Sequence, residues 1–337
     1  MKSRLLLMIL LCAAAVAVQA QTQKKAQVGF RFLENPVAAE VMGRGGTGIV
    51  ATLNANGLFW NPALAGWVEP AADLSLNRTQ GIADIDYNAL AATLHLWDAG
   101  VIGLTFFTMD YGDFYGTRRA ANDQGYEETG VFSPSAYAVG LAFSQKVSER
   151  FSFGVQVKYA HQDLGGAWVA PQGTAFGDAG FAMSERGYSR GDFALDVGAY
   201  YDFLYNGIRF GAVLQNISRE IKYENEQFPM PFAVSFGLTV EPLHFFMEGE
   251  GTTDLLICAE SRHPRDFEEN LRVGAQYTVF GMVALRAGYQ AKFDERGLTA
   301  GLGFRYDLGG VPVRADYAYE AFGIFGAVHH FTLGVSY

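Results

Sequence analysis

Residues 151–159 read Phe-Ser-Phe-Gly-Val-Gln-Val-Lys-Tyr, so large apolar side chains alternate with small or polar ones. Because successive side chains of a β-strand point to opposite faces of a sheet, this period of two predicts a strand with one apolar face. The same alternation recurs in Leu-Arg-Val-Gly-Ala-Gln-Tyr-Thr at 271–278 and in Val-Ala-Leu-Arg-Ala-Gly-Tyr-Gln at 283–290. Each block is about ten residues long, the length of a tilted strand that crosses a bilayer.

Alternating blocks continue from residue 71 to the C-terminus, and they predict an all-β fold of about fourteen antiparallel strands. The predicted strands are 71–79, 86–96, 100–109, 134–146, 150–161, 191–203, 207–217, 230–240, 242–252, 267–279, 281–292, 297–307, 311–320 and 327–337.

The predicted connections are alternately short and long. The short ones are 97–99, 147–149, 204–206, 241, 280 and 308–310, and the long ones are 110–133, 162–190, 218–229 and 253–266. This alternation is typical of outer-membrane barrels with short periplasmic turns and longer extracellular loops. A secreted β-sandwich is the alternative, but its polar face meets water and is expected to be rich in Lys, Glu and Thr. Here that face holds glycine, serine and isolated charges, which favours a crowded lumen.

The composition supports a membrane barrel. The chain has 40 Gly, 27 Phe and 17 Tyr, only 18% charged residues and a net charge of −10. The sequence contains no run of 18 apolar residues, the length that a membrane-spanning helix needs. If the chain crosses a membrane, only a closed barrel could do so. An acidic chain without basic clusters argues against nucleic acid as a partner.

The first 20 residues predict a signal peptide. Lys2 and Arg4 precede an apolar run at 5–18, which is followed by the small-x-small pattern Val18-Gln19-Ala20. The sequence therefore divides into a signal peptide at 1–20, an N-terminal plug segment at 21–70 and a transmembrane barrel at 71–337.

The plug is predicted from the composition of residues 41–64. Glycine, asparagine and proline exclude a long helix here, yet the segment is too apolar for a solvated loop. It must be enclosed by a partly polar wall, because irregular backbone needs hydrogen-bond partners. Gly43, Gly45 and Gly48, with Gly46 among them, match the dinucleotide motif G-x-G-x-x-G, but no βαβ unit surrounds them. We therefore expect these glycines to let the backbone fit a confined lumen.

Charged side chains fall on the inward face of the predicted strands. They are Lys158, His244, Glu248, Glu250, Arg272, Arg286, Arg305, Arg314 and Asp316. Carboxylates beside a histidine could be catalytic or bind a metal, but no nucleophile motif accompanies them. We expect ion pairs that fill the lumen and hold the plug, with no catalytic residue, metal or cofactor. Cys12 lies in the predicted signal peptide, so Cys258 is the single cysteine of the predicted mature chain. It is expected in a surface loop.

The long connection at 162–190 mixes aromatic residues with charges. Two readings stay open for it: a loop that binds a partner, or a loop that only folds over the barrel mouth.

The motif Trp60-Asn61-Pro62-Ala63 carries a resemblance. The sequence resembles the FadL family of outer-membrane transporters for hydrophobic compounds, in which an N-terminal plug carries an Asn-Pro-Ala motif. With Ala39, Met42-Gly43 and Gly46-Thr47-Gly48, the segment is similar to the PorV/PorQ family of FadL-like barrels linked to type IX secretion. The resemblance implies that Asn61, Pro62 and Ala63 sit in the plug, inside a barrel in the bacterial outer membrane.

Two functions follow from this resemblance. The first is a non-enzymatic component of type IX secretion, in contact with outer-membrane lipid and with a translocon, a sortase or cargo proteins. The second is a passive transporter of hydrophobic, fatty-acid-like small molecules. The second function needs an apolar pocket beside the plug.

Overall fold

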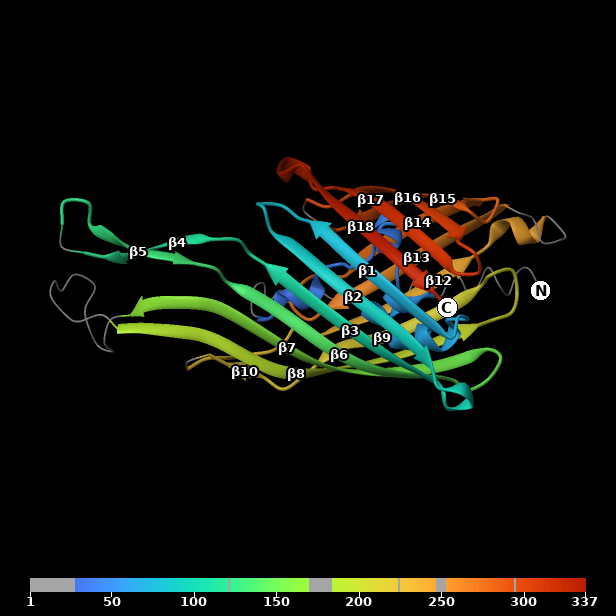
Figure 1. Ribbon diagram of the computed structural model, residues 1–337, viewed down its shortest axis with the longest axis horizontal. Helices are drawn as coiled ribbons and strands as arrows, with labels where there is room; N and C mark the ends of the chain where they lie inside the picture. The colour runs from blue at the N-terminus through green and yellow to red at the C-terminus, as the bar shows by residue number, and fades with distance from the viewer. Residues whose placement is uncertain (1–27, 121, 170–183, 224, 247–252, 294) are drawn as a thin grey trace.

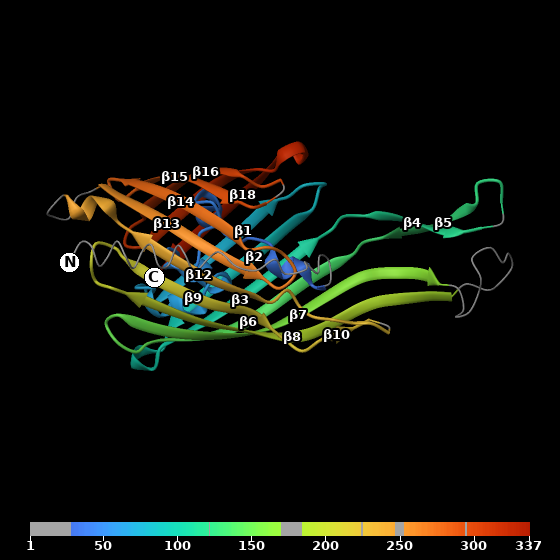
Figure 2. The ribbon, with the colours of Figure 1, turned by 180° about the vertical axis from the view of Figure 1, so that it is seen from behind.

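The structure is a computed structural model that describes residues 28–120, 122–169, 184–223, 225–246, 253–293 and 295–337. A single closed barrel of fourteen antiparallel strands dominates it (Figures 1 and 2). The barrel closes where the first strand, β1 (Ala72–Gln80), pairs with the last, β18 (Ala327–Ser336), in a register that runs from Asp73 opposite Ser336 to Gln80 opposite His329. The predicted all-β fold and the predicted number of strands are confirmed.

The other barrel strands follow chain order around the wall. They are β2 (Asp86–His95), β3 (Val101–Asp110), β6 (Ser135–Lys146), β7 (Phe151–Val169), β8 (Ser184–Asp202), β9 (Arg209–Ile217), β12 (Ala233–Val240), β13 (Thr253–Pro264), β14 (Asn270–Val279), β15 (Val283–Ala291), β16 (Leu298–Asp307) and β17 (Pro312–Ala321). The hairpins β4 (Phe114–Arg119)–β5 (Tyr126–Phe132) and β10 (Ile221–Lys222)–β11 (Gln227–Phe228) form separate two-stranded sheets.

Burial alternates along the strands as the sequence predicts. On β1, Ser75, Asn77 and Thr79 are buried inside, whereas Leu74 and Leu76 are exposed on the outer wall. Large apolar residues remain exposed on the outward face of strand after strand, which is the face that lipid covers in an outer-membrane barrel. In the described residues, no helix is both long and apolar enough to cross a membrane.

The predicted ninth strand is misplaced. Residues 242–245 form the 3₁₀-helix η5 (Pro242–Phe245), and the strand that pairs with β12 is β13, within the segment predicted as a long loop. Cys258 is therefore buried inside the barrel and does not lie in a surface loop. The error has a physical reason: pairing with β12 and β14 selects this segment as the strand, and its charged residues Glu260 and Arg262 have partners inside the barrel.

The N-terminal segment is almost entirely buried. It consists of η1 (Arg31–Glu34), α2 (Ala39–Gly43), η2 (Ala55–Phe59) and η3 (Pro62–Trp67). Asn54 and Asn61 begin η2 and η3, each accepting a backbone N–H two residues later, and Pro62 takes the first helical position. Inside the barrel, the segment packs against two separate parts of the wall: α2 contacts β16 and β17, and η3 contacts β6, β7 and β8.

The two ends of the barrel differ. Beyond Asp163, β7 pairs only with β8, and both strands continue past the wall beside the β4–β5 hairpin (Figure 1). The guanidinium of Arg118 on β4 lies 4.6 Å from the ring centre of Trp168 on β7, so the two hairpins are in contact. We call the β4–β5 hairpin, together with the parts of β7 and β8 that extend past the wall, the projection. The opposite end carries the tight turns and η4 (Trp97–Ala99).

Candidate functional site

Glycines in the wall make room for the N-terminal backbone. A side chain at Gly154 or Gly198 would overlap Pro62 or Asn61, and one at Gly274 or Gly288 would overlap Arg44 or Gly45. Gly301 lies directly against Gly43 in the same way. The small residues on the inward face are therefore the positions where the segment meets the wall.

Asn61 joins three parts of the molecule. Its Nδ2 donates to the carbonyls of Ile49 and Ala199, both at 3.1 Å, and its Oδ1 accepts the N–H of Ala63 at 3.1 Å. The carbonyl of Ala63 in turn accepts from the hydroxyls of Ser152 (2.8 Å) and Ser144 (3.1 Å). The Asn-Pro-Ala motif thus has hydrogen-bond partners on β6, β7 and β8.

The glycine-rich stretch is held by the opposite side of the barrel. The N–H of Gly45 donates to Thr299 Oγ1 (2.9 Å), which donates to the carbonyl of Gly43 (3.2 Å). Arg272 donates to the carbonyl of Gly46 at 3.1 Å. Gly45 and Gly46 have φ of 71° and 78°, a conformation in which glycine carries no side-chain clash.

Several of the predicted inward charges form ion pairs. Arg286 pairs with Asp316 (2.6 Å), Arg314 with Asp73 (2.6 Å) and Lys158 with Asp196 (2.7 Å). Asp73 also accepts the N–H of Ala55 at 2.8 Å, so this pair holds η2 as well. Arg305 shares a face with its cross-strand neighbour Arg314 but is exposed at the end of β16.

His244 was predicted on the lumen face, and this prediction is wrong. It lies in η5 with its side chain 48% exposed, because the ninth strand begins only at Thr253. Its Nδ1 is 3.1 Å from Glu241 and its Nε2 3.8 Å from Asp254, so its two nitrogens face different carboxylates. Glu241 also accepts from Arg209 at 2.7 Å, so one of these carboxylates already has an arginine as a partner. Glu248 and Glu250 lie outside the described residues, as does the predicted signal peptide.

Glu40 on α2 is an inward charge that the alternation of strands could not reveal. It is buried and accepts from Asn54 at 2.6 Å. Burial opposes its ionisation, but the charges of Arg44, Arg286, Arg314 and Arg305 outweigh that effect and lower the pKa of Glu40 to about 2. The positive charges of these arginines therefore favour the ionised form of Glu40 in the folded chain.

A small cavity of about 70 Å³ remains beside the N-terminal segment. Part of its lining is apolar, with Phe32, Leu33, Met42, Trp60 and Phe107, and the rest is polar: Gln156, Lys158, Asp196, Gln215, Arg262, Arg272, Gln290 and Arg296. A wider cavity of about 690 Å³ shares Phe32, Glu34, Asn35 and the three arginines with the first and extends toward Phe267, Glu268, Lys292 and Phe293 at the barrel mouth. We call the wider cavity the vestibule.

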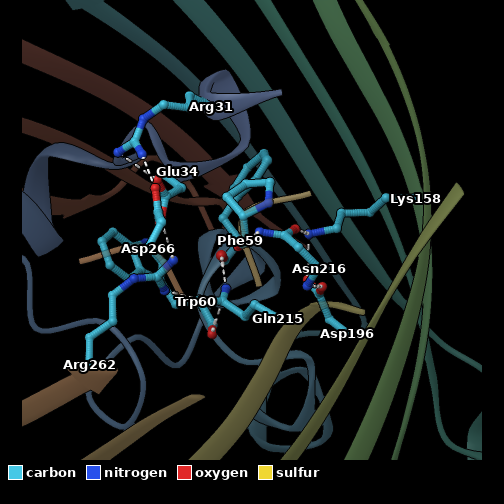
Figure 3. Close-up of polar contacts among 11 residues, drawn as sticks. Arg31, Glu34, Phe59, Trp60, Lys158, Asp196, Gln215, Asn216, Arg262 and Asp266 are labelled. Carbon is cyan, nitrogen blue, oxygen red and sulfur yellow. Dashed lines mark hydrogen bonds and ion pairs between the residues drawn. The ribbon is translucent and has the colours of Figure 1, made fainter. Parts of the chain in front are cut away.

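A chain of polar contacts runs along these cavities (Figure 3). Gln215 donates to the carbonyls of Phe59 (3.1 Å) and Trp60 (3.4 Å) and accepts from Arg262 at 2.6 Å. Arg262 lies 3.3 Å from Glu34, which pairs with Arg31 at 2.9 Å, and Arg31 also pairs with Asp266. These contacts connect the N-terminal segment to the β13–β14 connection.

The fold is similar to those of two solved toluene transporters and a solved FadL homologue. The Ralstonia pickettii toluene transporter TbuX superposes with a TM-score of 0.57 and 13% identity over 93% of this chain and 98% of that chain. A Pseudomonas aeruginosa FadL homologue gives a TM-score of 0.56 and 13% identity over 90% and 98%, and the Pseudomonas putida toluene transporter TodX gives 0.56 and 14% over 93% and 98%. At these identities the likeness shows the fold alone: a FadL-like outer-membrane β-barrel.

The family is shown by sequence. The profile of the type IX secretion system membrane proteins PorP/SprF matches residues 50–337, and the chain belongs to this family. A search of curated proteins gives no match. The type IX prediction is supported, whereas the finer PorV/PorQ name is not, because the matching profile is that of PorP/SprF.

Proposed function

We propose that this chain is a non-enzymatic component of type IX secretion that receives or tethers exported cargo through the projection and associated partner proteins. The membership in a type IX membrane family supports the process. The projection supports the role, since it extends at the end expected to be extracellular.

The projection has the features of a protein-binding element. Tyr115 on β4 is 82% exposed and Val131 on β5 is 57% exposed. Neither residue belongs to the barrel wall, because β4 and β5 form a separate sheet. In the part of the chain that the structure describes, the sheet of β4 and β5 has two strands, so each strand has an unpaired edge that could accept a further strand. Exposed apolar side chains beside free edges favour contact with another polypeptide.

The buried N-terminal segment favours a role for the barrel as a receptor over a role as a channel through which folded protein passes. Hydrogen bonds to β6, β7, β8, β14 and β16 hold it across the lumen. In this proposal the segment is a plug, and cargo meets the barrel at its mouth and is not threaded through it.

Complementation of a deletion strain tests the secretion role. We expect type IX cargo to accumulate in the periplasm without the gene, and also when residues 113–133 are replaced by a short Gly-Asn turn. Trp97→Ser is the matched control, because it removes a side chain that is 91% exposed at the opposite end. Heat-modifiable migration shows in each case that the barrel is assembled. Normal cargo release by the deletion strain would refute the proposal.

A second candidate is passive transport of a hydrophobic small molecule. The cavity beside Phe32, Met42 and Trp60 favours it, and two of the fold relatives are described as toluene transporters. Uptake of radiolabelled toluene into cells with and without the chain is the direct test. Narrowing the cavity with Ala138→Phe should reduce uptake and leave cargo release unchanged, whereas equal uptake in all strains would remove this candidate.

A further inference from the structure

Basic side chains outnumber acidic ones in the lining of the vestibule. Arg31, Arg262, Arg272, Lys292 and Arg296 line it, against the two carboxylates of Glu34 and Glu268. The chain as a whole has the opposite balance, with 35 acidic and 25 basic residues. Carboxylates outside the lining compensate three of these cations: Asp266 pairs with Arg31, Glu269 lies 3.9 Å from Lys292, and Glu320 lies 3.7 Å from Arg296.

Arg272 on β14 is the least compensated of these cations. It donates to the carbonyl of Gly46 at 3.1 Å, but its buried Nε has no hydrogen-bond partner. Among the described residues, no carboxylate oxygen lies within 4.0 Å of its guanidinium nitrogens. Its cross-strand neighbour is Glu260, whose Oε1 accepts from Ile49 and whose buried Oε2 has no hydrogen-bond partner, so the two charged groups are neighbours without a direct hydrogen bond. Buried guanidinium donors that stay unused are costly, and an added oxyanion would satisfy them.

Arg296 is only partly compensated. Its Nε lies 3.7 Å from Glu320 Oε1, which already accepts from Gln290 at 2.9 Å. The other carboxylate oxygen of Glu320 is 3.2 Å from His330 Nε2. Arg296 therefore has a neighbour of opposite charge but no charge-assisted hydrogen bond to it.

Aromatic rings hold both side chains in place. The guanidinium carbons of Arg272 and Arg296 each lie 5.7 Å from the centre of the Phe293 ring, and that of Arg272 lies 5.9 Å from the Trp60 ring. A ring contact satisfies the face of a guanidinium but not its N–H groups. The two arginines around Phe293 thus keep donors that no described residue uses.

We propose that Arg272 and Arg296 form a binding site for an oxyanion, a phosphate or carboxylate group that enters from the barrel mouth. The planar donors of a guanidinium match both groups. Arg31 and Arg262 already have Asp266 and Glu34 as partners, so they shape the rim and the field of the site. This inference goes beyond the proposed function and does not depend on whether the barrel serves secretion or transport.

Calorimetry on the full-length protein in a non-ionic detergent tests the site. Inorganic phosphate, acetate and glycerol phosphate are titrated separately at constant ionic strength. We expect phosphate to bind, with at least about tenfold weaker binding in Arg272→Gln and in Arg296→Gln, since each removes a charge-assisted contact. Arg272→Lys should give an intermediate loss because it keeps the charge but not the planar donors. Arg78→Gln is the control, since Arg78 lines neither of these cavities and forms an exposed pair with Asp86.

The three titrants distinguish the source of the anion. Binding of free phosphate or acetate indicates a small anion, and binding of glycerol phosphate alone indicates an oxyanion carried on a larger ligand. Either result supports the site if it is lost in Arg272→Gln. Failure of all three to bind the wild-type chain, or equal binding by the Arg272→Gln variant, would overturn the inference. Heat-modifiable migration confirms assembly of each variant.

Discussion

The lumen contains two regions built from the same residue types and packed very differently. Around α2, η2 and η3, wall glycines touch the N-terminal backbone and Asp73, Asp316 and Glu40 lie among arginines. Around η1 and the loops at the mouth, cavities remain and Arg272 keeps unused donors. We call the packed region the clamp, because its contacts and ion pairs hold the N-terminal segment against the wall. The open region has the cavities and unused donors expected of a binding site.

The largest expected effect comes from breaking the pair of Arg314 and Asp73 in the packed region. Arg314→Met leaves a buried carboxylate without its counter-ion, and we expect a loss of about 3–5 kcal/mol in the free energy of unfolding. Urea unfolding in detergent micelles measures it. Arg78→Met is the matched control and should cost at most about 1 kcal/mol, because its pair with Asp86 is exposed. Equal losses in the two variants would contradict the distinction between clamp and surface.

A side chain at a wall glycine should separate the segment from the wall. Gly288→Val places atoms on the backbone of Arg44 and Gly45, and overpacking costs about 1–3 kcal/mol. We expect the N-terminal segment to become sensitive to protease while the barrel still shows heat-modifiable migration, since the inter-strand hydrogen bonds remain. Gly297→Ala is the control, because the nearest atom to the new Cβ would lie at 3.7 Å. Protection of the segment in Gly288→Val would show that the wall yields instead.

Acidification should loosen the packed region. The pKa of Glu40 is about 2 in the folded chain and 4.5 in the unfolded reference, so its ionised form contributes stability at neutral pH. That contribution is fully present above about pH 4.5 and is lost as the pH falls through about 2. Protease sensitivity of the segment between pH 5 and pH 2 should rise more steeply in the wild type than in Glu40→Gln. Parallel profiles would mean that Glu40 does not hold the segment.

The smallest effect is expected in the open region. Lys292 lies 3.9 Å from Glu269 with its side chain 47% exposed, so Lys292→Gln should change the unfolding free energy by less than about 1 kcal/mol. A large loss in the same urea titration would show that the vestibule is also part of the clamp.

Thirteen of the fourteen barrel strands overlap their predicted ranges, because the constraint that creates the pattern is local. Each strand must turn one face to lipid and one to the lumen, and this requirement imposes a period of two within about ten residues. The range predicted for the ninth strand is wrong because apolar and polar residues alternate at 242–252 just as well as at 253–264. Pairing with β12 and β14 selects the second stretch, with Val240 opposite Ile257 and Val279 opposite Thr253.

The candidate site was only partly predictable for the same reason. Alternation identifies Arg272, Arg286 and Arg314 as inward-facing, but it does not assign their partners. Arg286 meets Asp316 across two strands, and Arg314 meets Asp73 across the closure of the barrel. Glu40 and Gln215 become visible only when the N-terminal segment is packed against the wall.

The sequence by itself determined the class of fold, the direction in which each strand faces and the residues that could enter the lumen, because side-chain alternation and chain composition are properties of short segments. Tertiary structure alone decided which inward groups are paired, which arginine keeps an unused buried donor and where cavities remain. Those outcomes depend on strand register and barrel closure, which bring together residues more than 200 positions apart.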